Sequence, residues 1–222
     1  MEFIKFRPIG AYMVNSYALV SDKNNAVIID APLGAKSGIS DLQSKGITIK
    51  KILLTHGHCD HIERLSDISE KTGAEVYIHM NDAEKLADSS TNLSDNMPDM
   101  FPPSLFRGAE KVVEIKDNDV IVLDDISIKV IHTPGHTSGG VCYVVEDMIF
   151  SGDTLFFGSI GRTDMFDGSI SQMKKSLEKL GEFSGEFKNY KVYPGHGSST
   201  TLLDEKDRNP FMQKGLSYDD LF

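Results

Sequence analysis

The sequence has no tryptophan, only two cysteines, and no apolar run of the length that a membrane-spanning helix needs. The two cysteines, Cys59 and Cys142, lie far apart and provide no disulfide framework, which fits a reducing compartment. The first residues of the chain also lack the apolar core of a signal peptide. We therefore expect a cytoplasmic protein without a membrane partner.

An excess of basic charge is missing as well. The chain carries 23 lysines and arginines against 33 aspartates and glutamates, a formal net charge of −10, with no run of basic residues. Proteins that bind the phosphate backbone offer a basic face, so we expect no nucleic-acid partner. With 40% hydrophobic and 25% charged residues, the composition is that of a globular protein, and the length suits one large domain over residues 1–222.

What the sequence does contain is a dense cluster of metal-binding residue types between Thr55 and His61, reading T-H-G-H-C-D-H. Ahead of the cluster, residues 51–54 form a short apolar run that predicts a buried strand. Behind it, residues 62–71 place apolar side chains at helical spacing. The cluster therefore lies on a strand-to-helix turn, at the strand end where α/β proteins bind ligands.

The four polar side chains of this turn divide into two pairs. Alternation within the turn can point His56 and His58 the same way, whereas the adjacent Asp60 and His61 favour a second point in space. A single histidine in a turn would be explained as surface polarity, but three histidines and an aspartate this close are costly to desolvate without a metal. Imidazole and carboxylate ligands suit zinc or iron, and a closed structural zinc site more often draws on cysteine.

Three further apolar strands end in the same residue types. His136 lies in T-P-G-H-T, Asp153 in G-D-T and His196 in P-G-H-G. Each has a glycine or proline beside it, which lets the backbone turn sharply. Five of the seven histidines of the chain lie in these turns or in the 55–61 turn, which indicates one shared site.

Two strand-end residues outside these turns need separate interpretations. Asp30 follows a fully apolar run over residues 27–29 and can cap the next turn. It can also hold a metal-bound histidine through the free N–H of the ring, and we favour this role because the next apolar strand ends in the histidine cluster. His79 follows another apolar run, but no other ligand type accompanies it, and we interpret it as a polar strand end.

The chain mixes strands and helices throughout, with no internal repeat and no linker, which indicates a two-sheet core with helices outside. Turn-rich segments predict a hairpin around residues 21–25 and another around residues 146–147. The predicted strands cover residues 3–8, 12–20, 25–30, 51–54, 75–79, 111–115, 120–123, 127–132, 141–145, 148–151 and 191–193, and the predicted helices cover residues 36–45, 62–71, 82–87 and 171–180.

Residues 89–108 show no periodicity, yet they include several methionine, phenylalanine and leucine side chains. Loops this long inside a domain are usually functional or disordered, and the apolar content argues against disorder. A lid over the site and a packed surface loop are about equally supported, with Phe101 and Phe106 as the side chains that would distinguish them.

The order of the motifs closely resembles that of the metallo-β-lactamase superfamily of hydrolases. The resemblance implies the α/β class and a four-layer αββα sandwich, with the site at one edge of the two sheets. It also implies two Zn²⁺ ions, or alternatively iron or a mixed iron–zinc pair. The implied ligands are His56, His58 and His136 for one metal and Asp60, His61 and His196 for the second, with Asp153 bridging both.

Within the superfamily the chain looks most like the small glyoxalase II-like branch, through residues 152–156 and 158–164. That branch cleaves thioesters such as hydroxyacyl-glutathione with a metal-bridging hydroxide. The resemblance implies a small-molecule thioester substrate, with Asp60 and Asp153 as catalytic residues. Full-length glyoxalase II has a helical C-terminal domain that helps to hold glutathione, and few residues follow His196 here, so we expect a loose preference for the thiol half.

Two residues near the site have two interpretations each. Arg162 can pair with a carboxylate of the substrate, or it can form a salt bridge with Asp164 two residues away, and we give these equal weight. Cys59 lies inside the histidine cluster, but we favour a small packing residue over a metal ligand.

The same ligand types fit a second class of reaction. Persulfide dioxygenases share this fold and a similar G-R-T-D loop, and they use one iron held by the residues equivalent to His56, His136 and Asp153. A catalytically inactive metal-binding scaffold is a third hypothesis, disfavoured because every ligand position is filled.

Overall fold

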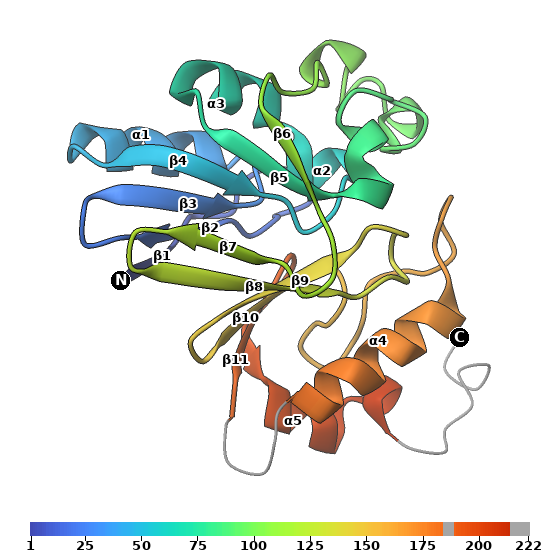
Figure 1. Ribbon diagram of the computed structural model, residues 1–222. Coiled ribbons are helices and arrows are strands. Elements are labelled where there is room, and N and C mark those ends of the chain that lie inside the picture. Colours follow the sequence, from blue (N-terminus) through green and yellow to red (C-terminus); the bar gives the residue numbers. More distant parts are fainter. Residues whose placement is uncertain (184–188, 214–222) are drawn as a thin grey trace.

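Two sheets lie face to face in the computed structural model, which describes residues 1–183 and 189–213 (Figure 1). Helices cover the outer face of each sheet, so the molecule has four layers in the order helix, sheet, sheet, helix. The predicted αββα sandwich is therefore confirmed. Among the described residues, none of the helices has the length and apolar character needed to cross a lipid bilayer.

The first sheet contains six strands in the order of the sequence. Its first three strands pair antiparallel, and the predicted hairpin between the second and third is confirmed. From the third strand onward the pairing is parallel, which brings the carboxyl ends of these strands to one edge. The strands are β1 (Glu2–Lys5), β2 (Tyr17–Val20), β3 (Asn25–Ile29), β4 (Thr48–Leu53), β5 (Glu75–His79) and β6 (Val112–Ile115).

The second sheet also has six strands, in the order β12-β11-β10-β9-β8-β7. All neighbours pair antiparallel except β10 and β11, which run parallel, and the hairpin between β9 and β10 is confirmed. The strands are β7 (Val120–Leu123), β8 (Ile126–His132), β9 (Val141–Val145), β10 (Met148–Gly152), β11 (Lys191–Pro194) and β12 (Thr200–Thr201).

Three apolar layers hold the sandwich together, and strand alternation distributes the side chains among them. In β3, Val27 and Ile29 face the second sheet, where they pack with Tyr143 and Phe150. Ile28, between them, faces the opposite way and packs under the helices of the first sheet. The third layer lies between the second sheet and the helices near the C-terminus.

The helices predicted over residues 36–45 and 171–180 are confirmed, whereas the helix over residues 202–208 was not predicted. The predicted helix over residues 62–71 is divided, because the backbone of Ala31 enters the gap and bonds to both His61 and Arg64. The predicted helix over residues 82–87 is a 3₁₀ helix. The helices are α1 (Ala35–Ser44), α2 (Cys59–Ile62), α3 (Leu65–Thr72), α4 (Ile170–Phe183) and α5 (Leu202–Arg208), with 3₁₀ helices η1 (Met80–Leu86), η2 (Ser94–Asn96), η3 (Pro103–Leu105) and η4 (Pro210–Met212).

The predicted strand over residues 12–20 was wrong in its first half, since β2 begins only at Tyr17. Asn15 explains the difference: its side-chain amide donates to the carbonyls of Pro194 and Gly197, on either side of His196. The backbone of Asn15 also donates to Gly195 at 2.7 Å. Residues that hold the His196 turn in this way cannot continue the ladder of the first sheet.

Candidate metal centre

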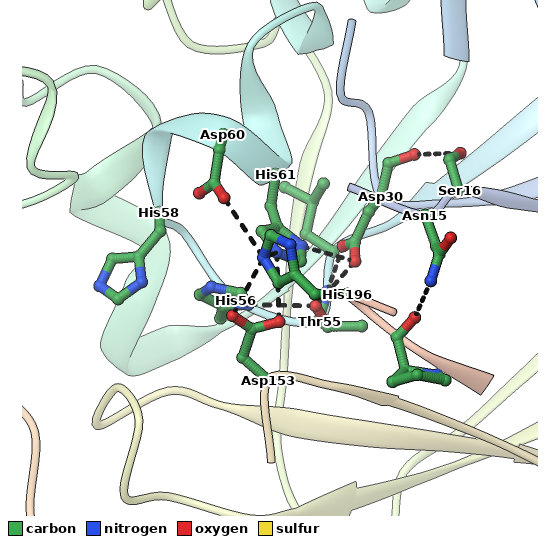
Figure 2. A network of polar contacts seen from close by, with 12 residues as sticks. Asn15, Ser16, Asp30, Thr55, His56, His58, Asp60, His61, Asp153 and His196 are labelled. Carbon is green, nitrogen blue, oxygen red and sulfur yellow. Dashed lines mark hydrogen bonds and ion pairs between the residues drawn. The ribbon is translucent and has the colours of Figure 1, made fainter. Parts of the chain in front are cut away.

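The turn between β4 and α2 brings its histidines to the open edge of the two sheets, where the turns after β8, β10 and β11 also end. His56 and His58 lie with His136 in one group, and Asp60 and His61 lie with His196 in another. Within each group, one potential ligand atom from each residue lies within 4.8 Å of the others. Figure 2 shows His56, His61, Asp153 and His196 converging, with Asp60 beside them.

Asp153 lies between the two groups. Its Oδ1 is 3.3 Å from His61 Nε2, and its Oδ2 is 3.4 Å from both His136 Nε2 and His196 Nε2. It also forms a third potential ligand group with His56 and His61. The structure thus brings together all seven residues that the sequence predicts as ligands, in the two predicted sets, and their ligand roles stay predictions.

Four of the imidazoles are oriented by a hydrogen bond from the ring nitrogen that points away from the cluster. The His136 ring donates to the carbonyl of Arg162 at 2.7 Å, and the His196 ring donates to the carbonyl of Tyr12 at 2.9 Å. His61 donates to Asp30 at 2.9 Å, and His56 lies 3.1 Å from the Thr55 hydroxyl. Such outer partners fix the tautomer and direct the other nitrogen inward.

Asp30 fills both of the roles considered for it. Its carboxylate accepts from the backbone N–H of Thr55 at 2.8 Å and from the Thr55 hydroxyl at 2.9 Å, which caps the start of the turn. It also accepts from His61, and only 2% of Asp30 is exposed. Because the Thr55 hydroxyl donates to Asp30, it is free to accept from His56, so one carboxylate orients two of the histidines.

Two observations show that the residues fit a bound metal. Among the described residues, His56 Nε2 and Asp153 Oδ1 are buried side-chain atoms without a hydrogen bond, and both belong to the cluster. Asp153 Oδ1 has only the ion-pair contact of 3.3 Å with His61 Nε2. Buried polar atoms without partners are rare in folded proteins, and a cation would satisfy both. Gly195 lies so close to Asp153 and the His61 ring that any side chain there would collide with them, which keeps the space between the ligand atoms open.

The two groups differ in their proton affinity. Burial, followed by the neighbouring imidazoles, lowers the pKa of His56 well below its ordinary value. Burial and His136 likewise lower the pKa of His58 to about 3. Neutral imidazole is the form that binds a metal, so these two rings need no deprotonation at neutral pH.

The second group is rich in carboxylates and behaves in the opposite way. Burial alone would lower the pKa of His196, but Asp153 and Asp60 raise it to about 9. The same carboxylates, with Asp30, overcome burial and raise the pKa of His61 well above its ordinary value. In return the pKa values of Asp60 and Asp153 are lowered, despite the opposing effect of burial. The cluster therefore attracts positive charge, which either protons or divalent metals can supply.

A cavity of about 770 Å³ opens onto the cluster, and a small molecule can reach the cluster through it. His58, Asp60, His136, Asp153 and His196 form its floor. Leu93 and Met97, from the long 89–108 segment, line the same cavity. Phe101 and Phe106 of that segment are instead buried in the core under the first sheet, so the segment is both a packed loop and a wall of the site.

The remaining sequence interpretations have mixed outcomes. Arg162 pairs with Asp164 through two contacts of 2.9 Å and also lines the cavity. Cys59 is 3% exposed and packs in the core, and burial raises the pKa of its thiol to about 12, which agrees with a packing residue. His79 is a buried strand end, but it stacks on His132 with ring centroids 4.0 Å apart.

Sequence reasoning missed the backbone carbonyls of Tyr12 and Arg162, because a carbonyl leaves no signal in the residue type. It also missed Asp82, which is fully buried and accepts from the backbone of Gly57 at 2.9 Å. The same carboxylate accepts from the Thr137 hydroxyl at 2.8 Å and from the backbone of Gly139 at 2.9 Å. Asp82 therefore joins the turn of His56 and His58 to the turn of His136.

Two curated proteins are similar to this chain over nearly its whole length. A probable metallo-hydrolase of Bacillus subtilis, YqgX, is 37% identical over 92% of this chain and 95% of its own length. A hydroxyacylglutathione hydrolase of Haemophilus influenzae, GloC, is 29% identical over 94% of this chain and 97% of its own.

Three solved structures have the same fold over nearly the whole chain. The BLEG-1 B3 metallo-beta-lactamase superposes with a TM-score of 0.82 at 31% identity, covering 96% of this chain and all of that one. TTHA1623, solved in a di-iron-bound form, gives 0.79 at 28% identity, covering 94% and 100%. ETHE1 from Myxococcus xanthus gives 0.75 at 26% identity, covering 95% and 84%.

The family model described as the metallo-beta-lactamase superfamily matches residues 9–198, a range that contains every residue of the cluster. The relatives match over nearly the whole chain, and the two-sheet architecture agrees with the family fold. The chain belongs to the metallo-beta-lactamase superfamily.

Proposed function

We propose that the protein is a dinuclear zinc hydrolase that cleaves small-molecule thioesters in the cytoplasm. The observation that carries the proposal is the pair of three-residue ligand groups with Asp153 between them, at the floor of one cavity. His56, His58 and His136 would hold one metal, and Asp60, His61 and His196 the other, with Asp153 shared. Superfamily membership supports metal-dependent hydrolysis in general, and the likeness to GloC supports the thioester.

Each part of the chain has a distinct task in this reaction. A pair of zinc ions, when bound, supplies Lewis acidity and lowers the pKa of a bound water to about 7. Asp60 lines the cavity and is ionised at neutral pH, so it can accept the proton that the attacking water loses. The orienting bonds from His61 to Asp30 and from His136 to the Arg162 carbonyl keep the ligand set rigid. The reaction releases a carboxylic acid and a thiol, and no serine or cysteine nucleophile is needed.

The direct test is release of free thiol by zinc-loaded protein from a panel of thioesters that includes S-lactoylglutathione. A β-lactam belongs in the panel because BLEG-1 has the same fold. We expect turnover of thioesters that disappears on chelation and returns with zinc. Hydrolysis of the β-lactam alone, or of nothing in the panel, would reject the thioester assignment.

A mononuclear iron persulfide dioxygenase is the second candidate, favoured by the similarity to ETHE1. That reaction needs one iron at His56, His136 and Asp153 and leaves Asp60 and His196 without a metal role. Metal analysis of protein purified without added metal separates the candidates. Two zinc ions per chain support the hydrolase, whereas one iron, with oxygen uptake on glutathione persulfide, supports the dioxygenase.

A further inference from the structure

We infer that the substrate carries an uncharged hydrocarbon group beside its reactive bond, which packs on an apolar wall around Leu93. The thioester part of this statement rests on the proposed function. The hydrocarbon group is argued from the cavity alone, so the two can fail separately.

The cavity wall above the cluster is mostly apolar. Tyr12, Leu93, Met97, Phe156, Ile160 and Phe166 line it. The hydroxyl of Tyr12 donates to the sulfur of Met97 at 2.6 Å, so its polar tip is already satisfied within the wall. Phe166 is 69% exposed at the cavity, and an exposed ring of this size gains free energy when a ligand covers it.

Leu93 occupies this wall at a cost to the backbone. Its φ angle is +71°, a left-handed conformation that residues with a β-carbon rarely adopt. The preceding residue, Asn92, is fully buried, and its carbonyl accepts from the backbone of Cys59 in the histidine turn. Its side chain is bonded to both Lys85 and Ser94. The residue before Leu93 is thus bonded to the histidine turn, and the side chain of Leu93 lines the cavity.

The positive charge of Arg162 at the cavity is already paired with a carboxylate. Among the described residues that line the cavity, Arg162 is the single lysine or arginine. Its guanidinium makes a bidentate pair with Asp164, with both contacts at 2.9 Å. A ligand such as glutathione carries two carboxylates and would have to displace Asp164 to pair with Arg162. An apolar group meets no such competition.

Binding of thiols to zinc-loaded protein tests this wall without relying on turnover. Glutathione and 3-phenylpropane-1-thiol share the sulfur, so calorimetric titration of the two compares only what lies beyond it. We expect the phenylpropyl thiol to bind at least about tenfold more tightly. Hydrolysis of two thioesters then shows which half of the substrate packs on the wall. One is the acetyl thioester of 3-phenylpropane-1-thiol, with the hydrocarbon on the thiol side, and the other is a 3-phenylpropanoyl thioester of a small thiol, with the hydrocarbon on the acyl side.

Two variants and one control sharpen the result. Leu93→Asn removes the apolar contact but suits the left-handed backbone, so we expect the phenylpropyl thiol to bind about tenfold more weakly with no fall in the unfolding midpoint. Asp164→Ala releases Arg162, and we expect several-fold tighter binding of glutathione alone. Leu203→Asn, at a leucine that is 50% exposed on α5, should change neither affinity.

The outcomes separate the two proposals. Equal affinity for the two thiols, or no effect of Leu93→Asn on the phenylpropyl thiol, overturns the inference even if thioesters are hydrolysed. A preference for the phenylpropyl thiol that depends on Leu93, with no thioester cleaved, supports the inference and rejects the proposed function.

Discussion

Two buried aspartates hold the histidine turn, Asp30 at its two ends and Asp82 at Gly57 between them, and they do so in different ways. Asp30 accepts from Thr55 and His61 and acts directly on an imidazole. Asp82 touches no histidine of the cluster by hydrogen bond and acts on backbone, at Gly57 and Gly139. The comparison shows that one site is supported by two kinds of partner: one orients a candidate ligand, and the other fixes the distance between the turns that carry candidate ligands.

The charge environment of the two aspartates also differs. Asp82 pairs with Lys85 at 3.0 Å, a lysine that is 1% exposed and that also contacts Asp167 at 2.8 Å. Asp167 in turn accepts from the backbone and the hydroxyl of Ser138. The Asp82 side is therefore a buried ionic network, whereas Asp30 is surrounded by neutral donors and His61. Removing a member should cost folding stability on the Asp82 side and metal affinity on the Asp30 side.

The largest effect is expected at Asp153, which lies between the two ligand groups. Asp153→Ala removes the residue that we propose both ligand groups share, so we expect the affinity for each of the two proposed metals to fall by more than roughly 100-fold, beyond the loss of an outer partner. Metal content after dialysis against a weak chelator measures this. Full retention of one metal would mean that Asp153 does not bridge, and would weaken the division of the site into two groups.

Asp82→Ala is expected to have the next largest effect, on the free energy of unfolding of the metal-free protein. Lys85 would lose one of its two carboxylate partners, and three further donors would lose their acceptor. We expect a loss of about 3 kcal/mol, the lower end for breaking a buried pair, because Asp167 remains. Urea unfolding in the presence of a chelator measures it.

Lys85→Met is the matched control for that variant. It removes the cation but leaves Asp82 with its donors from Gly57, Thr137 and Gly139, so we expect a smaller loss. If Lys85→Met costs more than Asp82→Ala, the ion pair rather than the joining of the two turns accounts for the stability, and the comparison with Asp30 fails.

Asp30→Asn should lower metal affinity more than it lowers stability. The amide keeps the shape of the carboxylate but no longer favours the donating His61 ring. We expect the metal at Asp60, His61 and His196 to bind about 10- to 100-fold more weakly, or about 1.4 to 2.7 kcal/mol, with little change at the other metal. Competition with a chelator, read as two separate steps, measures this. Equal weakening of both metals would mean that Asp30 supports the turn as a whole, as Asp82 does.

The difference between the two aspartates also explains what the sequence could predict. Asp30 follows a buried strand whose neighbour ends in histidines, so strand pattern and residue type together indicated its position. Asp82 lies in a short helical run, and its partners are Gly57, Thr137 and Gly139, up to 57 positions away. No local pattern connects these residues, because only the folded sheets bring the two turns together.

The same distinction holds for the fold and for the rest of the site. Strands with period-2 or fully apolar patterns were predicted within a few residues, and so were α1 and α4, whose apolar spacing is regular. The predictions failed where a long-range hydrogen bond interrupts a local pattern, as at Ala31 between α2 and α3 and at Asn15 before β2. The candidate ligand residues were identifiable because imidazole and carboxylate clusters are rare in turns.

The smallest predicted effect concerns acid stability and Asp167, which belongs only to the Asp82 side. Burial alone would raise the pKa of Asp167, but Lys85 and the donors of Ser138 hold it below the ordinary value. A carboxyl with a lowered pKa stabilises the fold above its unfolded pKa, near 4, and this contribution is lost as the pH falls through the folded pKa.

Asp167→Asn should therefore cost about 1 kcal/mol at pH 7, a value reduced for partial exposure, and should flatten the loss of stability below pH 4. Asp164→Asn, at an exposed ion pair, should leave the loss of stability below pH 4 unchanged. The urea midpoints of all three proteins are measured between pH 3 and pH 7. If the midpoint of Asp167→Asn falls below pH 4 as steeply as that of the original chain, the Asp82 network is not the acid-sensitive side.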